Sequence, residues 1–174
     1  MEGITDEELM QQVAEGDLDL LKILFERHHR HVFNFLNKMT GDGMLSEDLT
    51  QEVFYKIMKY RTTYAKGRFV VWMFTIARNS LKTYYKRNNG LHDSLDEQHE
   101  KLFKTTDEEP EDYTQLQRAL DKLEAPDREL LILNRLREIK YNELAEIMNS
   151  TPGAVKTKVC RALKKLKTIY FENL

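Results

Sequence analysis

Residues 141–163 read YNELAEIMNSTPGAVKTKVCRAL and predict a helix-turn-helix, two helices joined by a tight turn. The first helix should turn Leu144, Ala145 and Met148 inward, and the small Ala145 lets the second helix cross closely. Asn149 lies where the chain must leave the first helix, and asparagine tolerates the left-handed backbone that such a turn needs. This segment therefore predicts a compact helical unit around it.

The second helix of this motif has a marked beginning and two different faces. Thr151 can cap its N-terminus, and Pro152 suits a first turn, where a missing N–H costs nothing. An apolar stripe follows at helical spacing: Val155, Val159, Ala162, Leu163, Leu166 and Ile169 or Tyr170. Small Gly153 and Ala154 let the N-terminus approach a DNA groove. The outer face carries Lys156, Thr157, Lys158 and Arg161. Such a helix fits the major groove. A generic hairpin with a solvated basic face is the alternative, and the joint pattern favours DNA binding.

The rest of the chain is also patterned as helices, which predicts an all-α protein. Thr5 and Glu8 form a capping box, and apolar residues then recur at helical spacing from Leu20 to Leu36. A turn at residues 41–43 precedes a helix that Ser46 can cap. Its buried stripe should be Leu49, Val53 and Ile57, and residues 60–67 form a loop. The inner face of the next helix should be Phe69, Trp72, Met73, Ile76, Ala77 and Leu81, with Trp72 expected in the core in preference to a base-stacking platform.

Residues 91–115 differ in composition from the blocks on either side. They hold two lysines and nine acids, include Pro110, and show no sustained helical or strand period. This composition cannot bury a core and predicts a linker. We therefore expect two small helical domains, residues 1–90 and 116–174, joined by an acidic flexible linker at 91–115.

Charge is distributed unevenly although the net charge is only -2. Residues 59–87 hold eight basic side chains and no acid, and residues 148–170 hold six basic side chains and no acid. The acidic linker lies between these two blocks. Because each neutralised phosphate adds affinity, the pattern predicts two separate contacts with polyanions, and two solvated faces are the alternative.

Several classes of site and location are disfavoured by the sequence. The single cysteine, Cys160, cannot form an internal disulfide, so a reducing cytoplasm is expected, and packing is expected for it ahead of a redox role. The N-terminus has no basic region followed by an apolar stretch, so no signal peptide is expected, and no apolar run approaches the roughly 20 residues that span a bilayer. His28, His29 and His31 do not converge on one helix face, which disfavours a metal site. No nucleotide-binding, nucleophile or catalytic carboxylate motif is recognisable. We expect no cofactor, no small-molecule substrate and no enzymatic activity.

Three motifs, in order, resemble those of the sigma-70 family. The block 123–166 resembles region 4, which reads the −35 promoter element. Residues 46–56, SEDLTQEVFYK, resemble the region 2 helix that docks on the clamp of RNA polymerase. Residues 69–79, FVVWMFTIARN, resemble the part that opens the −10 element. With regions 2 and 4 alone, the chain resembles the extracytoplasmic-function group. Asn149 stands where the family commonly has glycine in the turn, and Thr83 where it often has aspartate.

The resemblance implies a role for particular residues. The positions that dock on core polymerase in this family are matched here by Asp48, Gln51, Glu52 and Phe54. Because the buried stripe of this helix uses other positions, Phe54 should be exposed for that contact. The alternative is that Phe54 is half-buried in its own bundle. In the loop 60–69, aromatic residues alternate with cations, which suits single-stranded DNA. Tyr64 and Arg68 would capture a flipped base, and Arg78, Asn79 and Lys82 would hold the strand backbone. Ala154, Lys156, Thr157, Lys158 and Arg161 would contact the −35 duplex.

The implied partners are core RNA polymerase, through its clamp and flap, promoter DNA, and an anti-sigma factor. The linker would enter the polymerase cleft or RNA exit path, or serve as a plain tether. A DNA-binding regulator with an unrelated helical sensory domain is the second hypothesis, and it differs in what residues 46–82 do. A nucleic-acid-processing enzyme is the third, and it would need a metal or nucleophile cluster.

Overall fold

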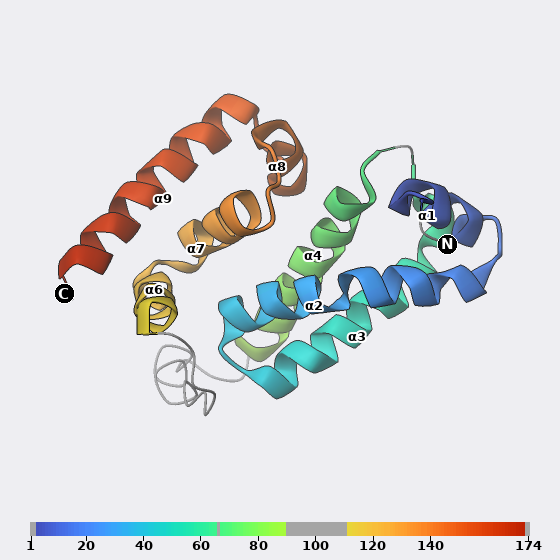
Figure 1. Cartoon of the computed structure of the whole chain (residues 1–174), viewed down its shortest axis with the longest axis horizontal. Coiled ribbons are helices and arrows are strands. Elements are labelled where there is room, and N and C mark those ends of the chain that lie inside the picture. The colour runs from blue at the N-terminus through green and yellow to red at the C-terminus, as the bar shows by residue number, and fades with distance from the viewer. Residues whose placement is uncertain (1–2, 66, 90–110, 173–174) are drawn as a thin grey trace. The chain divides into compact units, whose positions relative to one another are not determined.

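The computed structural model describes residues 3–65, 67–89 and 111–172, and every regular element in these ranges is helical, as the sequence predicts. The chain divides into two compact units, residues 1–102 and 103–174 (Figure 1). Most of the predicted linker, residues 91–110, lies outside the described residues. None of the described helices combines the length and apolar character needed to cross a bilayer.

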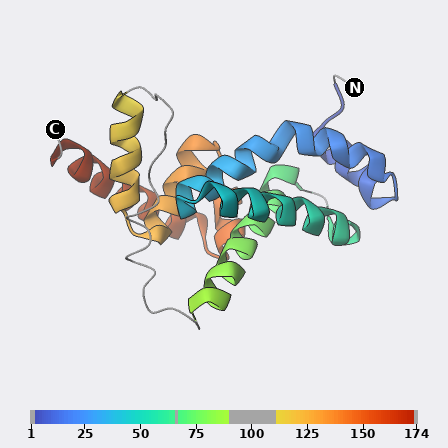
Figure 2. The same ribbon diagram turned by 90° about the horizontal axis from the view of Figure 1, so that it is seen from below.

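The N-terminal unit is a bundle in which α2 and α3 run side by side and α4 packs on α3 (Figures 1 and 2). Its described elements are α1 (Asp6–Ala14), the 3-10 turn η1 (Leu18–Leu20), α2 (Leu21–Thr40), α3 (Gly43–Lys59), the 3-10 turn η2 (Arg61–Thr63) and α4 (Phe69–Asn89). Fully buried side chains join all four helices: Leu9, Met10, Leu24, Phe35, Leu36, Ile57, Phe69, Met73 and Phe74. Phe35 and Phe74 meet edge to face, with ring centroids 5.7 Å apart. The bundle is held by one continuous apolar core.

The inner face of α4 is close to the predicted one. Phe69, Met73, Ala77 and Leu81 are buried as expected, whereas Trp72 and Ile76 are only half-buried. Val71 and Phe74 are buried instead. The helix is therefore covered on a wider arc than a single stripe, because it packs against both α2 and α3.

Helix beginnings in this unit follow local capping chemistry, with one correction. The Thr5–Glu8 capping box is confirmed: the Glu8 N–H donates to Thr5 Oγ1 at 3.2 Å, and the Thr5 N–H donates to Glu8 Oε2 at 2.9 Å. The prediction that Ser46 caps α3 is wrong. Asp42 has this role, because its Oδ1 accepts the N–H of Leu45 at 3.1 Å and the helix starts one turn earlier. The Ser46 hydroxyl is buried and donates to the carbonyl of Asp42 at 2.6 Å.

The C-terminal unit wraps short helices around one long one. Its described elements are α6 (Glu111–Lys122), α7 (Ala125–Leu131), the π-helical turn η3 (Ile132–Leu136), α8 (Tyr141–Met148) and α9 (Pro152–Glu172). Helix α6 begins five residues before the predicted domain start at 116. The acidic composition of this stretch concealed it, although acids are favourable in the first turn of a helix.

Arg128 ties the end of α6 to α7. Its Nε donates to the carbonyl of Leu120 at 3.0 Å, and its Nη2 donates to the carbonyls of Asp121 at 3.1 Å and Leu123 at 2.9 Å. The last carbonyls of a helix lack the usual partners within the helix. The guanidinium satisfies those of Asp121 and Leu123, and it adds a second donor to that of Leu120, which also accepts the N–H of Leu123 at 3.1 Å.

Glu138 makes the turn between η3 and α8 in a left-handed conformation, with a φ of 56°. This turn sends Ile139 back into the core, where it is fully buried, and its N–H donates to the carbonyl of Leu133 at 3.1 Å. An exposed glutamate gains nothing from this backbone, which costs a residue with a Cβ about 1–2 kcal/mol.

Replacing Glu138 by glycine should raise the free energy of unfolding of the C-terminal unit by about 1 kcal/mol, because the strain is removed and part of the gain is lost to a more flexible unfolded chain. Urea unfolding followed by far-UV circular dichroism measures this change. The fluorescence of Trp72, the only tryptophan, follows the N-terminal unit separately.

Asn149→Gly is the matched control, since Asn149 also has a positive φ, of 51°, but is a residue that tolerates it. Its stability should change by less than about 0.5 kcal/mol. A loss of stability in Glu138→Gly would contradict the assignment of strain to Glu138.

Candidate nucleic-acid interface

The predicted helix-turn-helix is formed by α8 and α9. Asn149 ends α8 in the left-handed conformation, as predicted, and its N–H donates to the carbonyl of Glu146 at 3.3 Å. The Ala154 N–H donates to Thr151 Oγ1 at 3.2 Å, which confirms Thr151 as the cap of α9. Leu144 and Ala145 are buried, but Ile147 takes the inward position expected for Met148, which is half-buried. The motif is therefore closed by local interactions that the sequence specifies.

Helix α9 has one buried face and one cationic face. Val155, Val159 and Ala162 are at most 1% exposed, whereas the later apolar residues of the stripe are half-buried. The predicted contact residues lie outside the core: Lys156, Thr157, Lys158 and Arg161 are exposed, and Ala154 is half-buried. The Thr157 hydroxyl donates to the carbonyl of Gly153 at 3.0 Å, which leaves its oxygen able to accept. The face presents three cations and one hydroxyl over two turns.

Lys165, a further cation of the basic block at residues 148–170, has a different role. The Nζ of Lys165 lies 3.0 Å from Oδ2 of Asp127 on α7, and this ion pair joins two helices of the C-terminal unit. Lys165 therefore belongs in part to the fold, whereas the cations at positions 156, 158 and 161 project from the first half of the helix.

In the N-terminal unit, the candidate site is the aromatic loop, which we define as residues 60–68, with the start of α4. Tyr64 is half-buried and its hydroxyl donates to the carbonyl of Gly67 at 2.6 Å. Its ring meets Trp72 edge to face, with centroids 5.2 Å apart, and Arg68 is exposed. The ring of Trp72 thus borders the predicted contact residue Tyr64, so Trp72 is neither fully core nor a free platform.

The ionisation of Tyr64 is biased by its surroundings. Burial, followed by the negative charges of Glu7 and Asp6, raises the pKa of the Tyr64 phenol above its ordinary value of 10.0. The hydroxyl therefore keeps its proton at neutral pH and can donate to a base or to the loop backbone.

A row of polar side chains continues along α4 from this loop. Asn79 and Lys82 are exposed and Arg78 is half-buried, so these predicted residues share one helix side at spacings of three and four. Lys86 is exposed and extends the same row by one turn, although we did not predict it as a contact residue. The sequence could have indicated Lys86, because it belongs to the basic block at residues 59–87 and lies four positions after Lys82, on the same helix face.

The outer face of α3 differs from our expectation at one residue. Asp48 and Gln51 are exposed, and Glu52 is half-buried with its Oε1 3.0 Å from Nζ of Lys56. The expectation that Phe54 is exposed is wrong, since Phe54 is 6% exposed. Its ring packs edge to face on Phe25 of α2, with centroids 4.9 Å apart, on a flank that the stripe of α3 alone does not reveal.

Tyr55 is the aromatic residue that this face presents. It is 56% exposed, and it lies four positions after Gln51 and seven after Asp48, so the three side chains follow one side of the helix. We define the predicted docking face as Asp48, Gln51, Glu52 and Tyr55; it combines carboxylates, an amide and an aromatic ring.

Two other groups singled out in the sequence are His28 and Cys160, and the exposure of Cys160 differs from expectation. His28 is buried and its Nε2 lies 2.8 Å from Oδ2 of Asp6. Among the described residues, no group of three or more His, Cys, Asp or Glu side chains is arranged to hold a metal ion. Cys160 is exposed, so the expectation that it packs inside the unit is wrong.

Comparison with known proteins places both units in one family. The family model of Sigma-70 region 2 matches residues 24–90, and that of Sigma-70 region 4 matches residues 113–166. The chain is 30% identical to the ECF RNA polymerase sigma factor SigM of Bacillus subtilis, over 84% of this chain and 93% of that protein. It is 28% identical to the RNA polymerase sigma factor CarQ of Myxococcus xanthus, over 94% of this chain and 96% of that protein.

Two solved structures share the fold. CnrH, in a complex with the cytosolic domain of CnrY, aligns with a TM-score of 0.75 and 18% identity, over 97% of this chain and 99% of CnrH. The sigma factor RpoE of Bartonella quintana, in a complex with the anti-sigma factor NepR, aligns with a TM-score of 0.69 and 24% identity, over 85% of this chain and 94% of RpoE.

Proposed function

This chain belongs to the sigma-70 family of RNA polymerase sigma factors, in its extracytoplasmic-function group, and from that premise we propose how its surfaces start transcription. It is a transcription initiation factor that directs RNA polymerase to promoters. The observation that carries the proposal is the presence of both family regions, each on a separate unit with its own exposed row of cations. A regulator with an unrelated sensory domain leaves the region 2 match at residues 24–90 without explanation.

The C-terminal unit reads the −35 element as duplex DNA through α9. The cap at Thr151 and the buried stripe hold the helix so that its first two turns enter the major groove. Lys158 and Arg161 contact phosphates or base edges, and Lys156 with Thr157 and Ala154 lies at the groove-facing start.

The aromatic loop reads the melted −10 strand. Tyr64 and Arg68 form the wall of a pocket for one flipped base, with a ring to stack and a cation for the phosphate. Arg78, Asn79 and Lys82 hold the strand backbone along α4, and Lys86 continues that path. Flipping costs a few kcal/mol, which binding offsets, so no nucleotide hydrolysis by this chain is needed.

The docking face of α3 binds the polymerase clamp. An exposed tyrosine is typical of an interface centre, and the amide and two carboxylates beside it suit the polar rim around such a centre. Phe54 supports this face from within the bundle and does not itself meet the partner.

Further partners follow from the C-terminal unit and from related proteins. A shallow groove between α6, α7 and α9 has an apolar floor with a charged rim, and we assign it to the polymerase flap; its lining is Lys122, Leu123, Glu124, Asp127, Lys164, Lys165, Thr168 and Ile169. An anti-sigma factor is a further partner, since RpoE of Bartonella quintana is found with one. A factor that works on core polymerase acts in the cytoplasm, without catalytic activity of its own.

In vitro transcription tests this function directly. Purified chain and core bacterial polymerase, supplied with a library of genomic promoter fragments, should yield transcripts from a defined subset that shares −35 and −10 motifs. Sequencing the transcripts gives those motifs. Core enzyme without the chain is the control, and an absence of chain-dependent initiation from every fragment would contradict the function.

Replacing Lys158 and Arg161 together by alanine should weaken binding of the holoenzyme to a −35 duplex selected in that assay. If both side chains contact phosphates, the slope of log K against log salt should fall by about 1.8, since each contact contributes about 0.9. Fluorescence anisotropy over a salt series measures it. Lys167→Ala is the matched control, because Lys167 is an exposed cation on the second half of α9, outside both the predicted DNA contacts and the groove assigned to the flap, and its slope should change less. Unchanged binding at every salt concentration would remove α9 from the interface.

Replacing Gln51 and Tyr55 by alanine should weaken binding to core polymerase at least about tenfold, the effect expected of an interface centre. The melting temperature should stay near that of the wild-type chain, because both side chains are exposed. Asn34→Ala, an exposed amide on α2, is the control. Phe54→Ala should instead destabilise the bundle by about 3–5 kcal/mol. Full affinity in the double variant, measured by titration of labelled chain with core enzyme, would contradict the docking face.

A further inference from the structure

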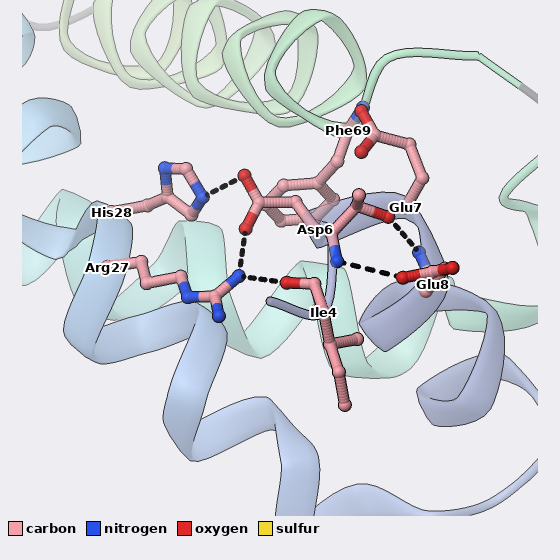
Figure 3. Close-up of polar contacts among 8 residues, drawn as sticks. Ile4, Asp6, Glu7, Glu8, Arg27, His28 and Phe69 are labelled. Carbon is pink, nitrogen blue, oxygen red and sulfur yellow. Dashed lines mark hydrogen bonds and ion pairs between the residues drawn. The ribbon is translucent and has the colours of Figure 1, made fainter. Parts of the chain in front are cut away.

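Helix α1 is fastened to α2 by a carboxylate that accepts from two side chains (Figure 3). Oδ1 of Asp6 accepts from Nη1 of Arg27 at 3.0 Å, and Oδ2 lies 2.8 Å from Nε2 of His28. Because an ionised carboxylate only accepts, Nε2 of His28 carries the hydrogen. Nη1 of Arg27 also donates to the carbonyl of Ile4 at 2.9 Å. Three side chains of α1, those of Leu9, Met10 and Val13, are fully buried. Together with these contacts of Asp6 they give α1 a fixed position on the bundle.

The next residue of α1 reaches a different helix. Oε1 of Glu7 accepts the backbone N–H of Phe69, the first residue of α4, at 3.1 Å and across 62 positions of sequence (Figure 3). The first N–H groups of a helix lack partners within the helix, and a carboxylate there also meets the positive end of the helix dipole. The sequence before α4, AKGR at 65–68, offers no Ser, Thr, Asp or Asn to cap it. Glu7 supplies the cap from a distance.

Phe69 is the point at which this cap meets the aromatic loop. Its ring is fully buried, 5.3 Å from the His28 ring and 6.3 Å from that of Trp72, between centroids. Tyr64 completes the cluster, 6.5 Å from Phe69 and 5.2 Å from Trp72. Arg68 precedes Phe69 directly. The backbone that Glu7 holds therefore carries both residues assigned to the flipped base.

We propose that Glu7 is a positioning residue for single-strand recognition: its hydrogen bond to Phe69 sets the geometry with which Tyr64 and Arg68 meet a base. The inference rests on the proposed role of the aromatic loop. It makes α1, which lies before the matched region 2 at residues 24–90, part of the −10 reading apparatus. Glu7 touches no DNA in this scheme and acts through the loop.

Glu7 and Glu8 allow this role to be separated from the stability of α1. Glu8 also accepts a backbone N–H, that of Thr5, but within the capping box of its own helix. Glu7→Ala removes the bond to Phe69, Glu7→Gln keeps an acceptor oxygen without the charge, and Glu8→Ala weakens α1 while leaving the bond to Phe69 in place. The three full-length variants are compared with the wild-type chain.

The first measurement needs no DNA. Trp72 is the only tryptophan and borders Tyr64, so acrylamide quenching of its fluorescence reports on the loop in the free chain. Glu7→Ala should give a larger Stern–Volmer constant, and Glu7→Gln and Glu8→Ala should stay near the wild-type value. Unchanged quenching in Glu7→Ala overturns the inference, and so does an equal increase in Glu8→Ala.

The second measurement uses holoenzyme and two labelled single-stranded oligonucleotides, one with the −10 motif found by transcription and one with that motif permuted. The ratio of their affinities should fall about fivefold to tenfold in Glu7→Ala, the loss of one cap expressed as an equilibrium constant. Glu7→Gln should restore the ratio, and Glu8→Ala should keep it.

A ratio that persists in Glu7→Ala, or that falls equally in Glu7→Gln, overturns the positioning role while leaving the proposed function of the loop intact. A wild-type holoenzyme that prefers neither strand overturns the proposed function of the loop, and this inference with it.

Discussion

Burial of one face of a helix decides what its other face can do, and both units depend on this constraint. In α9, Val155, Val159 and Ala162 are packed against α7 and α8, so the helix cannot rotate without exposing them. The cations at 156, 158 and 161 are consequently held outward at fixed positions along two turns. In the N-terminal unit, Phe69 likewise fixes what surrounds it, because its buried ring holds the end of the aromatic loop in place. Apolar packing thus sets the places of charges that themselves contribute little to stability.

The polar contacts that support these surfaces are local in one unit and distant in the other. The turn before α9 is completed by Asn149 and Thr151, within three residues of the groups they satisfy. The start of α4 is completed by Glu7, 62 positions away, and Glu7 is placed by its neighbour Asp6 through Arg27 and His28. The C-terminal motif can therefore be specified by a short sequence, whereas the loop that borders α4 needs the whole N-terminal bundle.

This difference explains what the sequence could predict. Capping at Thr5 and Thr151, the left-handed turn at Asn149 and the all-α class follow from neighbouring residues, and all are confirmed. Phe54 could not be placed, because Phe25 of another helix covers it and helical spacing on α3 alone leaves that flank undecided. The predicted start of α3 was one turn too late. Asp42 and Ser46 both offer an oxygen that could cap a helix, and the sequence does not show that Asp42 is the one used. The roles of the DNA-contacting and docking residues remain predictions, supported by exposure and by family.

The remote cap on α4 also has a consequence for how the chain acquires its structure. Helix α1 is synthesised before α4, and the N–H that Glu7 accepts belongs to a residue that emerges 62 positions later. Closing so long a segment carries an entropic cost that must be met before the contact contributes anything. Helix α1 can dock on α2 through Asp6 before α4 is made, but the bond from Phe69 to Glu7 can form only afterwards, so the aromatic loop should be among the last parts of the N-terminal unit to mature on a newly made chain.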